Sequence, residues 1–220
     1  MKKYSNEFKI DMLFILLLVI TLPYDLIVNS GEKLIRIVLI FLSIIGARLV
    51  YAKSFLKGYI IAYYMILGFI FISMYLGNVW SFYSILYYDK FLHLSSGFLT
   101  SIIGYILFLE LFNEKVRKGI KPNVSAIFVS IFSIAAAALW EIWEFTTDLL
   151  FGLDSQAGGL IDTMLDIISG TLVGIITALL IYRHYKGKNI KVIEKFISNK
   201  IGNRWEIIFL SIILKGKSNY

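Results

Sequence analysis

Cysteine is absent from this chain of 220 residues. Disulfide bonds, thiolate nucleophiles and cysteine-held metal clusters are therefore excluded, and cysteine usage gives no clue to the redox compartment. The sequence also contains no phosphate-binding P-loop, no nucleophile elbow and no HExxH helix. These absences exclude the commonest motif-based assignments to nucleotide hydrolases, serine hydrolases and zinc proteases.

Charged residues are scarce as well, at 17% of the chain, whereas 58% of the residues are hydrophobic and the mean hydropathy is +0.76. Soluble domains are much less apolar. The apolar runs reach the roughly 17–25 residues that a membrane-spanning helix needs. Runs of this length exclude the short strands of a membrane barrel. The sequence thus predicts an all-α, polytopic membrane helix bundle.

Six spans can be delimited along the chain. They cover about 10–28, 34–52, 58–77, 91–112, 124–151 and 163–182. We expect residues 1–185 to form one six-span transmembrane domain and residues 186–220 to form a separate basic tail. The net charge of +7 does not indicate nucleic acid, because the basic residues flank apolar spans, where they meet anionic lipid. Membrane lipids are therefore the expected partners.

The tail has the pattern of an amphipathic helix. Ile190, Ile193, Ile197 and Ile201 recur at i, i+3, i+7 and i+11, and basic residues occupy much of the remainder. A helix of this kind is typical of the membrane surface. We expect it to lie on the inner leaflet.

The distribution of Lys and Arg predicts the orientation. Basic residues gather before the first span, between the second and third, between the fourth and fifth, and after the sixth. The alternate connections hold only Lys33 and Lys90, with Arg36 a short way into the second span. Both termini are therefore predicted to be cytoplasmic.

Seven ionisable residues lie inside or beside the last three spans. They are Asp89, His93, Glu141, Glu144, Asp148, Asp162 and Asp166. An ionisable group at bilayer depth costs about 2.5–3.5 kcal/mol on insertion scales, so it usually faces a partner or a polar cavity. The predicted orientation places all seven near the outer face. We therefore expect one functional site within residues 87–170.

Helical spacing supports a shared site. On each of the three helices the ionisable residues are separated by three, four or seven positions and so share one face. Below His93 the same face continues with Gly97, and below Asp166 it continues with Gly170 and Gly174. Small residues allow helices to approach closely in lipid. The acidic faces are thus predicted to look at one another.

An oxygen-rich set with one histidine suits Mg²⁺, Mn²⁺ or Ca²⁺, and zinc held by His93 and carboxylates is an alternative. All seven residues are candidate ligands. Glu141, Glu144 and His93 are the candidate catalytic residues, with Glu141 or His93 as the general base. The expected function is a metal-dependent enzyme or binding protein that acts on a lipid or cell-envelope substrate.

Other interpretations of the same residues stay open. Asp89 and Asp162 lie at span ends, where they can cap helices, and His93 can serve as an interhelical hydrogen-bonding residue. Glu141 and Glu144 can instead pair with Arg36. For the whole protein the alternative is a proton- or cation-coupled transporter, which needs polar residues that continue to the inner side.

Three segments carry a resemblance to known families: YDKFLHLSSGF, ALWEIWEFTTD and GGLIDTMLDIISGTLVG. Together they resemble the YjdF-type family of bacterial multi-pass membrane proteins, over about residues 87–182. More distantly they are similar to VanZ-like proteins, although WEIWEF stands here in place of the usual E-x-x-Q-x-F stretch. The resemblance implies a bacterial cell-membrane location. It also implies a family site that contains Asp89, His93, Glu141, Glu144, Asp162 and Asp166.

Overall fold

A computed structural model describes residues 6–152, 154–156 and 159–197. Its elements are α1 (Asn6–Val28), α2 (Leu34–Lys53), α3 (Ile60–Ile70), η1 (Phe71–Val79), η2 (Phe82–Ser84), α4 (Tyr88–Leu111), α5 (Glu114–Arg117), α6 (Pro122–Phe151) and α7 (Leu160–Tyr185). The described part of the chain contains no strand, so the all-α prediction is confirmed.

Within the described residues, six helices are long and apolar enough to cross a membrane, and they fall on the six predicted segments. The third of these spans is formed by α3 and η1 together. Large apolar side chains such as Leu13, Ile27 and Ile161 are exposed on the outside of the bundle. A water-soluble protein rarely exposes such extensive apolar surface, whereas lipid accepts it. The polytopic architecture is thus confirmed.

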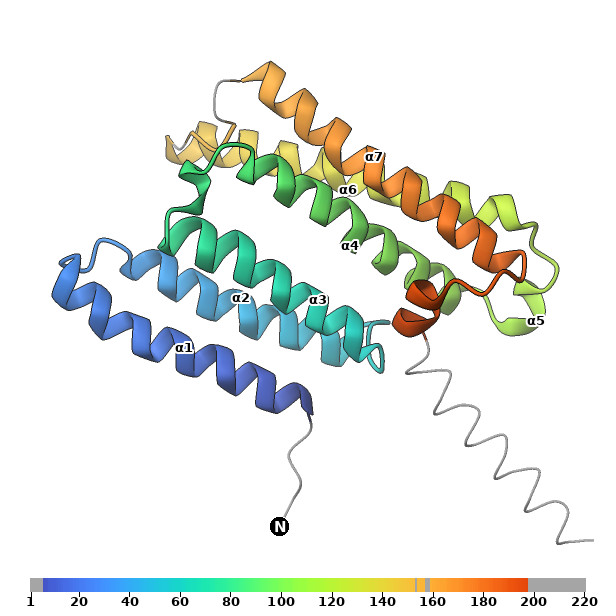
Figure 1. Ribbon diagram of the computed structural model, residues 1–220, viewed down its shortest axis with the longest axis horizontal. Helices are drawn as coiled ribbons and strands as arrows, with labels where there is room; N and C mark the ends of the chain where they lie inside the picture. The colour runs from blue at the N-terminus through green and yellow to red at the C-terminus, as the bar shows by residue number, and fades with distance from the viewer. Residues whose placement is uncertain (1–5, 153, 157–158, 198–220) are drawn as a thin grey trace, which may run out of the picture.

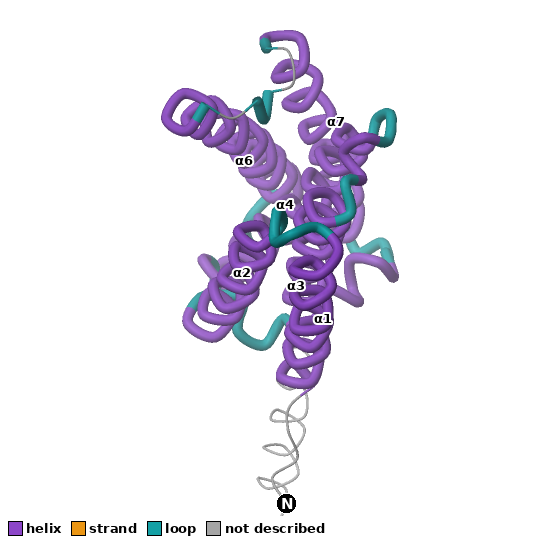
Figure 2. The backbone as a smooth tube through the Cα atoms, turned by 90° about the vertical axis from the view of Figure 1, so that its left-hand side faces the viewer, coloured by secondary structure: helices purple, strands orange, loops and turns teal. Residues whose placement is uncertain are grey.

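The spans form two groups, which Figure 1 shows one above the other. Helices α1, α2, α3 and η1 form the first group, and α4, α6 and α7, which pack closely against one another, form the second group. Contacts between α3 and α4 join the two groups. Figure 2 shows α6 diverging from α2 and α3, with α4 lying between them.

Close approach of the backbones explains the tight packing of α4, α6 and α7. A side-chain carbon at Gly97 on α4 would collide with the backbone carbonyl of Gly170 on α7. A side-chain carbon at Gly174 would collide with Ser133 on α6, and one at Gly170 would meet Ala137. The predicted glycine stripes therefore lie at the helix interfaces, as expected where van der Waals contact drives association in lipid.

The first part of the tail packs against the bundle. Residues 191–197 form a short helix in which Ile193 is fully buried and Ile197 is nearly so. The ring of Phe196 lies edge-on to Phe98 of α4, with 5.7 Å between the centroids. The isoleucine face thus meets protein over this stretch. Ile201 and the remaining predicted helix lie outside the described residues, and the location of the tail on the membrane surface stays a prediction.

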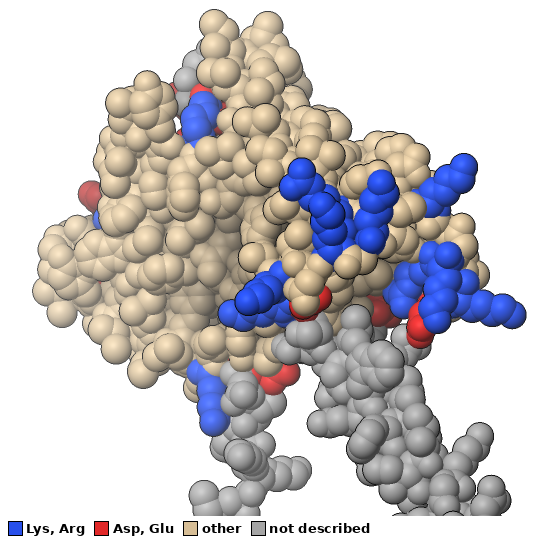
Figure 3. Space-filling model, turned by 45° about the vertical axis from the view of Figure 1, so that its right-hand side comes forward, with Lys and Arg blue, Asp and Glu red and all other residues tan. Residues whose placement is uncertain are grey.

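The two ends of the bundle differ in charge. Basic side chains gather at the end that carries α5 and the last turn of α7 (Figure 3), which we call the basic end. The opposite end carries the α1–α2 turn, the η1–α4 connection and the α6–α7 connection. We call it the site end, because six of the seven predicted site residues come together there.

Candidate functional site

The site is assembled from the first turns of α4 and α7 and the last third of α6. These segments meet because α6 runs antiparallel to both α4 and α7. The glycine contact between Gly97 and Gly170 lies one turn deeper than His93 and Asp166 and holds α4 and α7 close at this level. His93 is 6% exposed, Glu141 4% and Asp166 1%. Three ionisable groups are therefore buried at one interface.

Lys90 is the residue that the sequence analysis missed. Its Nζ lies 2.5 Å from Asp162 Oδ1, 2.7 Å from Asp166 Oδ1 and 3.3 Å from Asp89 Oδ2. The ammonium group thus crosses from α4 to α7 and compensates the two aspartates there. In the sequence Lys90 looks like an ordinary loop charge. Only its place between Asp89 and His93, at the start of a span, gave a signal.

His93 occupies the centre of the site. Its Nε2 lies 3.6 Å from Asp89 Oδ1 and 3.6 Å from Asp166 Oδ1, and its Nδ1 lies 3.9 Å from Glu141 Oε1. These distances exceed those of ordinary hydrogen bonds. The imidazole is thus surrounded by carboxylates from α4, α6 and α7 without being tightly bonded to any of them.

Glu141 is the most unusual group of the site. Both of its carboxylate oxygens are buried, and neither takes part in a hydrogen bond with any residue that the structure describes. Buried carboxylates are normally paired or bind a metal. Glu144, one turn along α6, accepts a hydrogen bond of 2.8 Å from Trp140 Nε1 and keeps its other oxygen available.

Two overlapping groups of side chains have the spacing of metal ligands. One ligand atom each from His93, Glu141 and Glu144 lie within 4.8 Å of one another, and so do atoms from Asp89, His93 and Asp166. Lys90 already compensates Asp166, whereas no Lys or Arg forms an ion pair with Glu141 or Glu144 among the described residues. The set of His93, Glu141 and Glu144 is therefore the better cation site. In the other set, Asp89 and Asp166 lie beside the His93 ring.

Asp148 and Arg36 are placed differently from the expectations. The Asp148 carboxylate accepts hydrogen bonds from the backbone amides of Ser155 (2.9 Å) and Gln156 (3.0 Å), so it caps the α6–α7 connection and is not one of the clustered ligands. Arg36 donates to the carbonyl of Asn78 at 2.7 Å. Arg36 therefore forms no ion pair with Glu141 or Glu144 in the described part of the chain, and Lys90 compensates the aspartates of the site.

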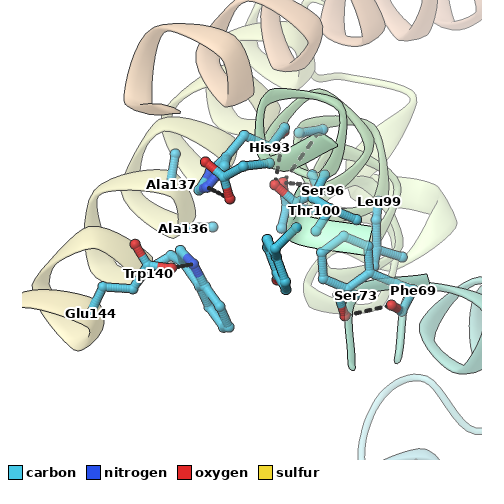
Figure 4. Close-up of a pocket in the computed structure, with 14 residues that line it drawn as sticks. Phe69, Ser73, His93, Ser96, Leu99, Thr100, Ala136, Ala137, Trp140 and Glu144 are labelled. Atoms are coloured by element: carbon cyan, nitrogen blue, oxygen red, sulfur yellow. Dashed lines mark hydrogen bonds and ion pairs between the residues drawn. The ribbon is translucent and has the colours of Figure 1, made fainter. Parts of the chain in front are cut away.

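A cavity of about 140 Å³ adjoins the site between α3, α4 and α6. Figure 4 shows His93 and Glu144 beside it, with Leu99 and Ala136 farther along. Tyr83, in the connection before α4, also lines the cavity. Burial raises the pKa of the Tyr83 hydroxyl, and the nearby carboxylates of Asp89 and Glu144 raise it further. Its phenol therefore stays a hydrogen-bond donor at neutral pH.

The third span ends as a π-helix, which no sequence pattern predicted. Over η1 the turns are wider, and this geometry often occurs at functional sites. The carbonyl of Ile72 accepts a hydrogen bond of 2.6 Å from the Tyr88 hydroxyl, which ties η1 to the start of α4. Gly77 leaves room for the ring of Tyr83. The π-helix thus positions the aromatic side of the cavity.

Comparisons with known proteins agree with this architecture. A family model described as "Predicted membrane protein (DUF2238)" matches residues 13–187. A Thermotoga maritima protein that carries the name "Uncharacterized protein" is 31% identical over 120 residues, which are 54% of this chain and 60% of the relative. The chain thus spans about 60% of that relative's length. No solved structure matches.

Proposed function

Since the chain belongs to the DUF2238 family of predicted membrane proteins, we propose that it is a multi-pass membrane protein that binds a divalent cation and acts on a lipid or cell-envelope substrate. His93, Glu141 and Glu144 are the proposed ligands. The resemblance to the YjdF-type family agrees with this membership, and the distant similarity to VanZ-like proteins stays a prediction.

The observation that carries the proposal is the buried Glu141 carboxylate without a hydrogen bond. The site contains one lysine, one histidine and five carboxylates, so a net negative charge remains after the charge of Lys90 is balanced. The carboxylates are those of Asp89, Glu141, Glu144, Asp162 and Asp166. Two carboxylates and one imidazole match the ligand preferences of Mn²⁺ and Zn²⁺, and carboxylates alone suit Mg²⁺ and Ca²⁺. The donor set thus fits a divalent cation.

The remaining groups have distinct roles in the proposed chemistry. A divalent cation in such a site polarises a phosphoryl oxygen or makes a bound water acidic. Asp89 and Asp166 flank His93 Nε2 and favour a proton on that nitrogen, which leaves Nδ1 on the side of Glu141. Lys90 holds the two α7 aspartates in place. Glu144 lines the cavity, so a cation that it helps to hold would lie beside a bound substrate.

The packing below the site favours an enzyme or binding protein over the alternative, a transporter. On the way to the basic end the α4–α6–α7 interface narrows at the Gly97–Gly170 contact. Deeper still, the described parts of the three helices bury Ile102, Val129 and Ile181 together with the hydroxyl groups of Ser101, Ser125, Ser133 and Thr177, but no charged side chain. Transported ions need polar groups along the whole path. The hydroxyls of Ser101, Ser125 and Thr177 already donate to carbonyls of their own helices, so a continuous ion path through the described part of the interface is poorly supplied.

Metal analysis of the purified protein tests the proposal. We expect about one equivalent of a divalent metal in the wild type and a loss of most of it in Glu141→Gln and in Glu144→Gln. Asp148→Asn is the matched control, because this carboxylate lies on the same helix but caps a loop. Metal should also raise the Tm of the wild type and not that of Glu141→Gln. Equal metal content in Glu141→Gln and the wild type would refute the assignment.

The proposed orientation places both termini in the cytoplasm of a bacterial cell and the site end outside. The gathering of basic side chains at the opposite end supports it (Figure 3). Since the chain lacks cysteine, single cysteines can be labelled with an impermeant reagent in whole cells. We expect labelling of Ser155→Cys at the site end and none of Lys118→Cys at the basic end. The reverse pattern would contradict the proposal.

A further inference from the structure

We propose that the cavity beside the site is a binding slot for one acyl chain of a phospholipid, taken from the leaflet at the site end. The inference rests on the proposed function for its choice of head group and deepens it by naming the substrate class. Three properties of the cavity support this proposal: the direction of its long axis, the placement of its polar groups at one end, and its position between α3 and α6.

The cavity is elongated along the helices. Its lining on α4 extends from Asp89 to Thr100, and its lining on α6 extends from Glu144 back to Ala136. With a rise of 1.5 Å per residue, the α4 lining covers about 16 Å along the helix axis. The helices cross the membrane, so this long axis runs parallel to lipid chains. A volume of about 140 Å³ is below the roughly 300–1,000 Å³ of pockets that enclose a drug-sized ligand, so the cavity has room for a slim segment such as part of one acyl chain.

Polar groups are available only at the mouth. The deeper hydroxyl groups of Ser73, Ser96 and Thr100 donate to backbone carbonyls of their own helices. These hydroxyl groups already have hydrogen-bond partners, so the deep part of the cavity needs no polar ligand atom. The remaining deep wall is apolar, with Phe69 and Leu99 among its side chains. A ligand that fits has one polar end and one apolar end.

The carboxylates define the polar end. His93, Asp89 and Glu144 lie at the mouth, beside the Tyr83 hydroxyl. A phosphate group is repelled by carboxylates unless a cation compensates them, and a divalent cation held by His93, Glu141 and Glu144 would supply that compensation. A phospholipid head group therefore fits at the same depth as the cation, with its chain directed toward Leu99 and Thr100.

The cavity is bounded by α3 on one side and α6 on the other. The principal contacts of α6 are with α4 and α7, whereas those of α3 are with α2, η1 and α4, so α4 forms the floor between them. Figure 2 shows α6 and α3 diverging from each other, with α4 between them. In a membrane this side faces lipid, and a chain can enter laterally without crossing water.

Photolabelling in nanodiscs tests the slot. The probe is phosphatidylglycerol with a photoreactive diazirine in one acyl chain, and labelled peptides are identified by mass spectrometry. We expect labelling around Phe69 and Ala136. Ala136→Phe should fill the slot and reduce labelling at Phe69 at least fivefold. The matched control is Ala135→Phe, because Ala135 is the neighbouring residue on the exposed face of α6, and it should label like the wild type.

Metal content and Tm are measured on the same samples. Normal folding and metal content with undiminished labelling in Ala136→Phe would overturn the slot and leave the metal site intact. A wild type without metal, whose labelling Ala136→Phe still blocks, would overturn the proposed metal function and leave the slot. Soluble glycerol phosphate should not compete with the probe at millimolar concentration. Full competition would show that the site takes a water-soluble phosphate and would overturn the lipid assignment.

Discussion

The two helix groups bury acidic side chains in opposite ways. In the first group, α1–α3 with η1, each buried acid has close partners. Asp25 accepts hydrogen bonds of 3.1 Å from both the Asn29 side chain and the Lys33 amide. Asp11 accepts one of 2.5 Å from the Tyr63 hydroxyl and lies 3.6 Å from Arg48 Nε.

The second group, α4, α6 and α7, leaves its central acid without such partners. Glu141 takes part in no hydrogen bond with a described residue, and the nitrogens of His93 lie 3.6–3.9 Å from the surrounding carboxylates. Satisfied polar groups rigidify a fold, whereas unsatisfied ones reduce stability and are kept for another reason. The comparison thus separates a half whose buried acids are paired from a half whose central acid has no hydrogen bond among the described residues.

The space around the glycines also differs between the two helix groups. In the first group a side-chain carbon at Gly46 or Gly68 meets no atom within 4 Å. In the second group, Gly97 lies against the backbone of Gly170, and Gly174 lies against the side chain of Ser133. Tight backbone contact therefore fixes the helices that carry the site.

The largest expected effect concerns the two lysines at the site end. Lys90→Met leaves Asp162 and the buried Asp166 uncompensated, so we expect a loss of about 3 kcal/mol in the free energy of unfolding, at the lower end for buried ion pairs because Lys90 keeps some exposure. Lys33→Met loses only a hydrogen bond to the Val79 carbonyl and should cost about 1 kcal/mol. Denaturation in detergent measures both. Adding Asp162→Asn to Lys90→Met should restore part of the stability, and no restoration would contradict the pairing.

The next effect compares two carboxyl-to-amide changes. Asp25→Asn replaces an acceptor of two hydrogen bonds with an amide that satisfies one donor, and we expect a loss of about 2 kcal/mol. Glu141→Gln removes a buried charge that has no hydrogen bond, so the metal-free protein should be as stable as the wild type or more stable. Thermal unfolding in the presence of a chelator makes the comparison. A larger loss in Glu141→Gln than in Asp25→Asn would reverse the roles of the two halves.

A third pair tests the glycine contrast. Gly97→Ala forces a methyl group against the Gly170 carbonyl, and overpacking of this kind costs about 1–3 kcal/mol. Gly46→Ala adds a methyl group in open space and should be neutral or stabilising by up to about 1 kcal/mol. The measurement is the Tm of the two variants in the same detergent. Similar Tm values would argue against the backbone contact between α4 and α7.

The smallest effect is expected at Asp148. Asp148→Ala removes the cap of the α6–α7 connection, so the Ser155 and Gln156 amides should exchange hydrogen faster, with metal content unchanged. Hydrogen exchange followed by mass spectrometry detects the change. Loss of metal in this variant would return Asp148 to the candidate ligands.

Much of the fold could be predicted because membrane insertion depends on local composition. A run of about 20 apolar residues must form a helix in lipid, whatever its neighbours are. All six spans followed from this rule. The helix period likewise placed Glu141 and Glu144 on one face of α6, and the glycine spacing indicated the faces that meet.

The first group shows where local patterns were not enough. Asp11 and Asp25 lie within the first apolar run, yet their significance depends on Tyr63, Arg48 and Lys33, which come from other segments. No spacing along α1 indicates such partners. Buried acids that pair across helices therefore cannot be separated by sequence from acids that serve a site.

The sequence by itself determined the membrane class, the six helices and the set of acids at one end, because hydropathy and helical period act along a single segment. Only the tertiary structure decided which of these acids are paired with a cation, which one caps a loop and which one has no hydrogen bond. Lys90 compensates Asp162 and Asp166, Asp148 turns to a loop, and Glu141 is left beside His93 without a hydrogen bond among the described residues. The physical reason is that pairing of buried charges depends on distances between helices, which the order of residues along one helix does not contain.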